Sequence, residues 1–134
     1  MRDLIICTTS AHARELGDIV DAVNVSRPTW NLLGFLAAGP DEPQDIKING
    51  LPVLGSVEDL DRFSEACFLP TPFTKPFDIG PERVDPERVV SLVAPTAFVA
   101  KTATLGSGCI LFPGCFVGGG ARLGDGVAAL ANCV

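Results

Sequence analysis

The segment Thr8-Thr9-Ser10-Ala11-His12 combines three hydroxyl side chains with the single histidine of the chain. Backbone amides at the start of a helix favour negatively charged groups such as phosphate, and nearby hydroxyls can add further hydrogen bonds. An imidazole at such a place can contact a ligand or simply begin the helix. The segment is therefore the natural candidate for a ligand site, with the role of His12 left open.

Other catalytic and metal-binding arrangements cannot be assembled from the residues present. One histidine allows neither a Ser-His-Asp nor a Cys-His set in the β-rich second half, so we name no catalytic residue. The five cysteines contain no C-x-x-C pair, and a single histidine cannot complete a typical zinc set. We expect no metal site and interpret the cysteines as small buried apolar residues. They are Cys7, Cys67, Cys109, Cys115 and Cys133.

Composition narrows the class of protein further. The 134 residues are 47% hydrophobic, which can supply a core, and the net charge is −6. Lysine and arginine are scattered, which argues against a nucleic-acid surface. The chain holds no apolar run as long as a membrane span and no signal-peptide pattern after Met1. These features predict a cytoplasmic protein with neither nucleic-acid nor membrane partners.

The first ninety residues read as an α/β unit that positions the candidate turn. A buried strand, an amphipathic helix and a second strand form a β-α-β start, which is the topology of a Rossmann-like half. No G-x-G-x-x-G occurs, and Ala37 follows Leu36 where a dinucleotide site needs an acid. The expected elements are strands over Asp3–Cys7, Trp30–Leu36 and Ala66–Leu69, helices from Ala11 to about Val23 and from Ser56 to about Phe63, an extended arm over Lys47–Gly55, and a proline-rich connector over Pro70–Pro86.

From Val93 the sequence repeats every six residues. The first position of each unit is aliphatic and the fifth is small, a period typical of short parallel strands stacked in a β-helix. The first positions should point inward, and we expect Cys109 and Cys115 to stack in one buried column. The units begin at Val93, Val99, Leu105, Leu111, Val117, Leu123 and Ala129.

These hexads resemble the left-handed β-helix of hexapeptide-repeat acyltransferases. Three upstream segments extend the resemblance to the sugar O-acyltransferase family, which includes sialic acid O-acetyltransferases and bacillosamine-pathway N-acetyltransferases. They are Ile5 to Glu15, Gly34-Phe35-Leu36 and Gly50 to Gly55. The resemblance implies a Rossmann-like substrate-binding domain over residues 1–90 and a left-handed parallel β-helix, incomplete, over residues 91–134.

The resemblance also implies site residues. The family has a glycine-rich loop ending in Gly-His, where this chain has Thr8, Ser10 and Ala11 at the glycine places and keeps His12. Acids that help hold the nucleotide follow Gly-Phe-Leu in the family; here Ala37 and Ala38 follow, and Asp41 and Glu42 lie in the loop beyond. The implied substrate-binding residues are Thr8, Thr9, Ser10, Ala11, His12, Leu36 and Ala37.

The implied activity is transfer of an acetyl or similar group from acetyl-CoA or another acyl-CoA to an amino or hydroxyl group of a nucleotide-linked or related sugar, in a homotrimer. In the family, a histidine one strand past a motif like Ala129-Leu130-Ala131-Asn132-Cys133-Val134 is the general base. That histidine is expected beyond Val134, so we expect a truncated β-helix and an inactive fragment. A non-catalytic binding or assembly protein with the same fold is the alternative.

Overall fold

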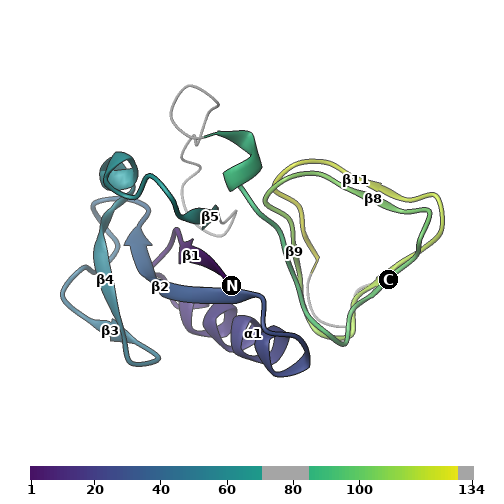
Figure 1. The fold of residues 1–134 in the computed structure, drawn as a ribbon, viewed down its shortest axis with the longest axis horizontal. Helices are drawn as coiled ribbons and strands as arrows, with labels where there is room; N and C mark the ends of the chain where they lie inside the picture. The colour runs from purple at the N-terminus through teal and green to yellow at the C-terminus, as the bar shows by residue number, and fades with distance from the viewer. Residues whose placement is uncertain (71–84, 130–134) are drawn as a thin grey trace.

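Two architectures follow each other along the chain, an α/β layer and a parallel β-helix (Figure 1). The structure is a computed structural model and describes residues 1–70 and 85–129. Most of the predicted proline-rich connector and the end of the last hexad, with Cys133, lie outside the described residues. Among the described residues, no helix combines the length and apolarity needed to cross a membrane.

The first layer is a five-stranded sheet in the order β3-β4-β2-β1-β5. Its four parallel strands have near-continuous apolar sequences, as strands covered on both faces do. A hairpin adds the short antiparallel strand β3 at one edge, and the two loop residues Asn49 and Gly50 both have positive φ, as a tight two-residue turn requires. The strands are β1 (Arg2–Ile6), β2 (Trp30–Ala37), β3 (Lys47–Ile48), β4 (Leu51–Ser56) and β5 (Cys67–Leu69).

Helix α1 (His12–Ser26) connects β1 to β2 and confirms the predicted β-α-β start. Its apolar stripe of Leu16, Ile19, Val20 and Val23 faces the sheet and joins the main core. None of the preceding hydroxyls caps this helix: Ala11 occupies the cap position without a side-chain hydrogen bond. The Ser10 hydroxyl instead forms a hydrogen bond with the Thr8 hydroxyl, and the Ser10 carbonyl accepts the amide of Ala13 (3.0 Å).

The helix predicted after Ser56 is a 3₁₀ helix, η1 (Val57–Arg62). Ser56 and Asp59 form a complete capping box, in which each side chain accepts a hydrogen bond from the other end of the first turn. The short turn η2 (Pro86–Arg88) then leads into the β-helix. The Arg88 guanidinium donates to the carbonyls of Phe63 and Ala66 and stacks over Phe68, which fixes this junction against the sheet.

The hexads form a three-sided coil, as Figure 1 shows when it is viewed end-on. Each pairing joins residues 18 apart, so three hexads complete one turn. The glycines at fourth positions 108, 114, 120 and 126 all have φ between 70° and 77°, the left-handed conformation that the corners require. The strands are β6 (Leu92–Val93), β7 (Phe98–Val99), β8 (Thr104–Leu105), β9 (Ile110–Leu111), β10 (Phe116–Val117), β11 (Arg122–Leu123) and β12 (Ala128–Ala129).

The prism interior confirms the predicted register. Leu111, Cys115 and Val117 are buried there, and the other first positions pack around them together with the fifth positions Ala97, Ala103 and Ala121. The predicted common column of Cys109 and Cys115 is wrong, because neighbouring hexads lie on different faces. The amide of Cys109 bonds to Ser91, 18 residues earlier, while Cys115 lies in register with Ala97.

One apolar core continues from the sheet into the β-helix. Leu92, Ala94, Ile110 and Phe112 project from the β6–β9–β12 face and pack in the same cluster as Leu16 of α1. The β-helix is thus held directly against the helix and sheet of the first layer.

Candidate functional site

The carboxyl ends of β1, β2 and β4 meet at one edge of the sheet because these strands are parallel. Three chain segments leave the sheet there: the turn at Thr8, the loop from Ala38 and the start of η1 after Ser56. Strand β1 lies between β2 and β5, so the chain passes to opposite sides of β1 in its successive crossovers. Such a reversal point is where open parallel sheets usually bind ligands.

The turn after β1 is buried and polar. Thr8 is fully buried and Thr9 is 3% exposed. Among the described residues, these two are the polar residues that are buried. Thr8 Oγ1 lies 2.9 Å from Ser10 Oγ, and the Ser10 amide donates to Thr8 Oγ1 at 3.1 Å. Buried hydroxyls of this kind need partners to offset the loss of water.

The partner is a carboxylate from the next loop. The backbone amide of Thr9 donates to Glu42 Oε1 at 2.7 Å, and the amide of Ala38 donates to the same oxygen at 2.9 Å. The Thr8 hydroxyl lies 3.2 and 3.0 Å from the two carboxylate oxygens. Glu42 therefore bridges the carboxyl ends of β1 and β2, in the place where the sequence predicts an anionic ligand.

The remaining predicted site residues divide into accessible and buried ones. Ala11 is exposed, and the His12 side chain, 44% exposed, lies 3.7 Å from Glu15 Oε2 through Nδ1. Leu36 and Ala37 are fully buried, with Leu36 packed in a core with Ile5 and Phe68. The turn formed by residues 8–12 thus lies beside the end of β2. The Leu36 side chain is part of the core and does not face the site.

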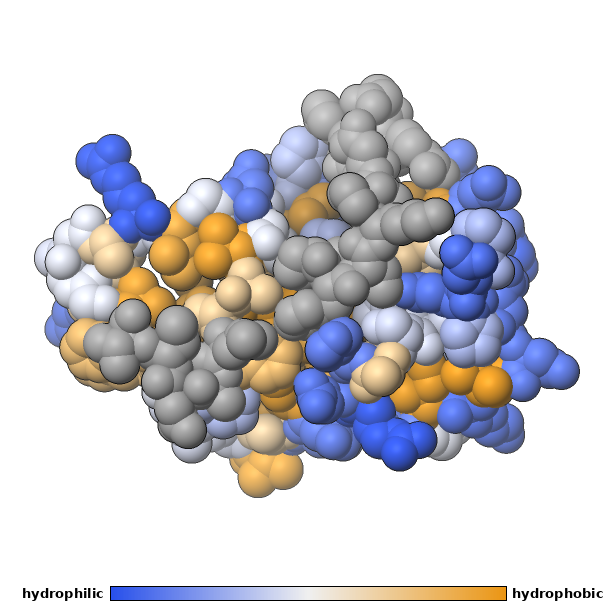
Figure 2. Space-filling view, turned by 180° about the vertical axis from the view of Figure 1, so that it is seen from behind, coloured by the Kyte–Doolittle hydropathy of each residue, from blue (hydrophilic) through white to orange (hydrophobic). Residues whose placement is uncertain are grey.

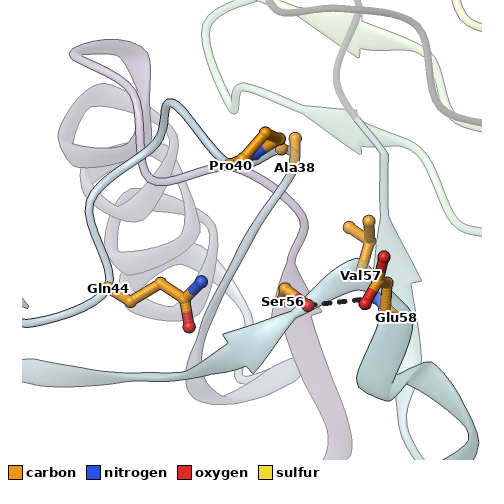
Figure 3. Close-up of a pocket in the computed structure, with 7 residues that line it drawn as sticks. Ala38, Pro40, Gln44, Ser56, Val57 and Glu58 are labelled. Carbon is orange, nitrogen blue, oxygen red and sulfur yellow. Dashed lines mark hydrogen bonds between the residues drawn. The ribbon is translucent and has the colours of Figure 1, made fainter.

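A pocket of about 320 Å³ opens beside Glu42, at the ends of β2 and β4. Its volume is at the lower end of the range for small-molecule sites. Figure 3 shows the Gln44 side chain extending from the loop toward the end of β4, where Ser56 accepts the amide of Glu58 at 3.3 Å. The lining residues are Ala38, Gly39, Pro40, Gln44, Ser56, Val57 and Glu58.

Sequence reasoning missed Glu42 as a site residue and missed the pocket lining. The available signal was position alone: Ala38 and Ser56 directly follow or end parallel strands whose carboxyl ends must share an edge. Asp41 and Glu42 lie in the loop beyond β2, and this loop folds back so that the Glu42 carboxylate reaches the end of the strand.

The cysteines are buried and structural in the described residues. Cys7, Cys67, Cys109 and Cys115 are free thiols, and burial raises the pKa of the Cys7 thiol far above its ordinary range. Within residues 1–70 and 85–129, no three His, Cys, Asp or Glu side chains gather as a metal site would need.

No protein-family model matches the sequence. A search of curated protein sequences gives no match either.

Solved structures share the fold. The acetyltransferase domain of PglB from Neisseria gonorrhoeae FA1090 matches 98% of this chain and 63% of its own length, with a TM-score of 0.72 and 20% identity. The same domain in complex with acetyl coenzyme A gives a TM-score of 0.70 and 23% identity, over 98% and 62% of the two chains. PerB from Caulobacter crescentus, in complex with CoA and GDP-perosamine, gives a TM-score of 0.69 and 17% identity. The match covers 98% of this chain and 61% of the PerB chain.

These likenesses confirm the left-handed β-helix that the hexads predict. At such identities they show the fold alone. The chain spans less than two thirds of the length of each of these structures.

Proposed function

We propose that the chain is the acceptor-binding, N-terminal part of an acyl-CoA-dependent acyltransferase of the sugar O-acyltransferase family. The acceptor is an amino or hydroxyl group of a nucleotide-linked or related sugar. One observation carries the proposal: the α/β layer and the β-helix together match sugar acetyltransferase structures along 98% of the chain. The named structures are acetyltransferases, which does not favour a non-catalytic assembly protein.

The proposal divides the chain into a Rossmann-like acceptor domain, residues 1–90, and the first coils of the β-helix, residues 91–134. The turn from Thr8 to His12, the Ala38 amide and the neighbouring pocket support acceptor binding, because they place hydrogen-bonding groups and a concave surface at one edge of the sheet. The β-helix contributes to a homotrimer, and acyl-CoA lies between neighbouring β-helices.

Residues of the β-helix fit a CoA co-substrate. Lys101 and Arg122 are the two basic residues of the segment 91–134, and both are exposed. Exposed cations in a corner turn and on a strand of the β-helix suit the phosphate groups of CoA, while the rest of the chain is acidic. When bound, acyl-CoA supplies a thioester whose carbonyl carbon is attacked by the acceptor nitrogen or oxygen.

The transfer needs a base that removes a proton from the acceptor as the new bond forms and the CoA thiolate leaves. His12, the one imidazole in the 134 residues, lies at the start of α1 and not on the β-helix. We therefore expect this chain to bind an acceptor but to release no CoA thiol from acetyl-CoA in a thiol-trapping assay. Steady, acceptor-dependent thiol release would show that a residue of this chain can serve as the base, and it would contradict this expectation.

Titration calorimetry tests the acceptor assignment. The 134-residue chain should bind UDP- or GDP-linked 4-amino sugars more tightly than the free amino sugar, because the nucleotide adds contacts at the sheet edge. The corresponding nucleotide alone serves as the control for the sugar's contribution. If a chain with an intact thermal unfolding transition binds none of these compounds, the proposed function is wrong.

A further inference from the structure

The Glu42 carboxylate lies where a bound anion would be expected. It accepts the amide of Thr9 at 2.7 Å and the amide of Ala38 at 2.9 Å, both through Oε1. Hydroxyl donors complete the set, with Thr8 Oγ1 3.0 Å from Oε2 and Thr9 Oγ1 3.4 Å from Oε1. Backbone amides that converge on one oxygen from two strand ends form a fixed anion-binding concavity.

These donors cannot be left without a partner. Thr8 and Thr9 are buried, so their polar groups cannot turn to water without movement of the turn. A carboxylate and a phosphate oxygen both satisfy such donors with charge-assisted hydrogen bonds. Glu42 and an external anion are therefore interchangeable partners for the same groups, and only one of them fits at a time.

The loop that carries Glu42 also forms one wall of the neighbouring pocket. Ala38 donates its amide to Glu42 and lines that pocket, as do Gly39, Pro40 and Gln44. Withdrawal of the carboxylate removes the hydrogen bond that holds the Ala38 amide at the rim of the pocket, within the same loop as Gly39, Pro40 and Gln44. The state of Glu42 and the shape of the pocket are thus coupled.

We propose that Glu42 is a tethered internal anion that occupies the Thr9 and Ala38 amides, so that an anionic ligand enters this site only by displacing it. The device makes the site selective, because an external anion must compete with a carboxylate held nearby at high effective concentration. It goes beyond the proposed function, since it concerns any phosphate-type ligand at this edge of the sheet.

Pyrophosphate is the probe that tests the device. In the Glu42→Ala variant the amides are released, and we expect pyrophosphate to bind about tenfold more tightly than to the wild type, or better. In spectra of ¹⁵N-labelled protein, the amide signals of Thr9 and Ala38 should move on titration. Acetate, which replaces the lost carboxylate, should compete with pyrophosphate in this variant.

Asp45→Ala is the matched control, because it removes one negative charge from the same exposed loop without touching the turn. It should bind pyrophosphate as the wild type does. Equal affinity in Glu42→Ala and Asp45→Ala would reduce the effect to net charge and overturn the proposal, and so would weaker binding in Glu42→Ala. Should Glu42→Ala fail to fold, Glu42→Gln keeps the side-chain size, and an affinity no higher than wild type would again contradict displacement.

The internal anion and the proposed function can fail independently of each other. Tight pyrophosphate binding to Glu42→Ala, with no binding of nucleotide-linked sugars by either form, supports the internal anion and removes the acceptor assignment. If nucleotide-linked sugars bind and the amide signals of Thr9 and Ala38 do not move, the acceptor assignment is supported and the internal anion is contradicted.

Discussion

At the scale of single residues, the turn after β1 derives its polar character from the hydroxyl residues Thr8, Thr9 and Ser10. Thr8 and Ser10 hydrogen-bond to each other, and the turn begins α1 without a side-chain cap. The sequence predicted this polar turn, because its position after a buried strand and before an amphipathic helix is a local pattern. It could not predict the Glu42 contact, because that depends on how a loop 34 residues away folds back.

His12 is a polar and accessible residue of the turn, with a side chain 44% exposed. If it contacts a nucleotide-linked sugar, His12→Ala should lower the affinity about tenfold, the value of one hydrogen bond to a charged group. The melting temperature should stay close to that of wild type, because His12 packs in no core cluster. Calorimetry with Asp21→Ala, an exposed position on the same helix, is the control; equal affinity in both variants would leave His12 a helix-start residue only.

At the scale of elements, the β-helix could be predicted because each six-residue unit contains both a short strand and the turn at the next corner. The inward set at Leu111 and Val117 follows from that period, and the structure confirms it. Which residues stack required one further fact, that three hexads complete a turn. Once pairing joins residues 18 apart, Cys109 lies in register with Ser91, and Cys115 with Ala97.

The register predicts that an acid in the prism interior unfolds the β-helix. Leu111→Asp places an unpaired charge at a fully buried position and should cost more than about 4 kcal/mol, enough to abolish cooperative thermal unfolding. Thr104→Asp adds the same charge on an exposed strand position beside Arg122 and should melt within a few degrees of wild type. Unchanged melting of Leu111→Asp would show that the register is wrong.

At the scale of the whole molecule, one core joins the α/β layer to the β6–β9–β12 face of the β-helix, and the strand pairs β7–β10 and β8–β11 form its other two faces. On one of them Phe98 and Phe116 stack with ring centroids 5.0 Å apart and are 54% and 48% exposed. Figure 2 shows apolar surface over the β-helix half, while polar side chains cover much of the α/β half. Exposed aromatic pairs of this kind favour contact with another protein surface.

Self-association is the expected consequence. Sedimentation equilibrium should give a mass three times the 14.0 kDa of the chain, as the proposed trimer requires. The double change Phe98→Ser and Phe116→Ser should shift the equilibrium toward monomer, because it removes apolar area that association would bury. A monomeric mass for the wild type across the concentration range would contradict the trimer without affecting the acceptor site.

The measurement that tests the central claim most directly is amide shift mapping of the ¹⁵N-labelled chain with a nucleotide-linked amino sugar. We expect the shifted signals to cluster at the carboxyl edge of the sheet, at Thr8 to His12, at Ala38, and at Ser56 to Glu58, where the turn and the pocket meet. The β3–β4 hairpin turn at Asn49 and Gly50 should stay unchanged. Shifts confined to residues away from this edge, or no shifts at ligand concentrations in the millimolar range, would contradict an acceptor-binding sheet.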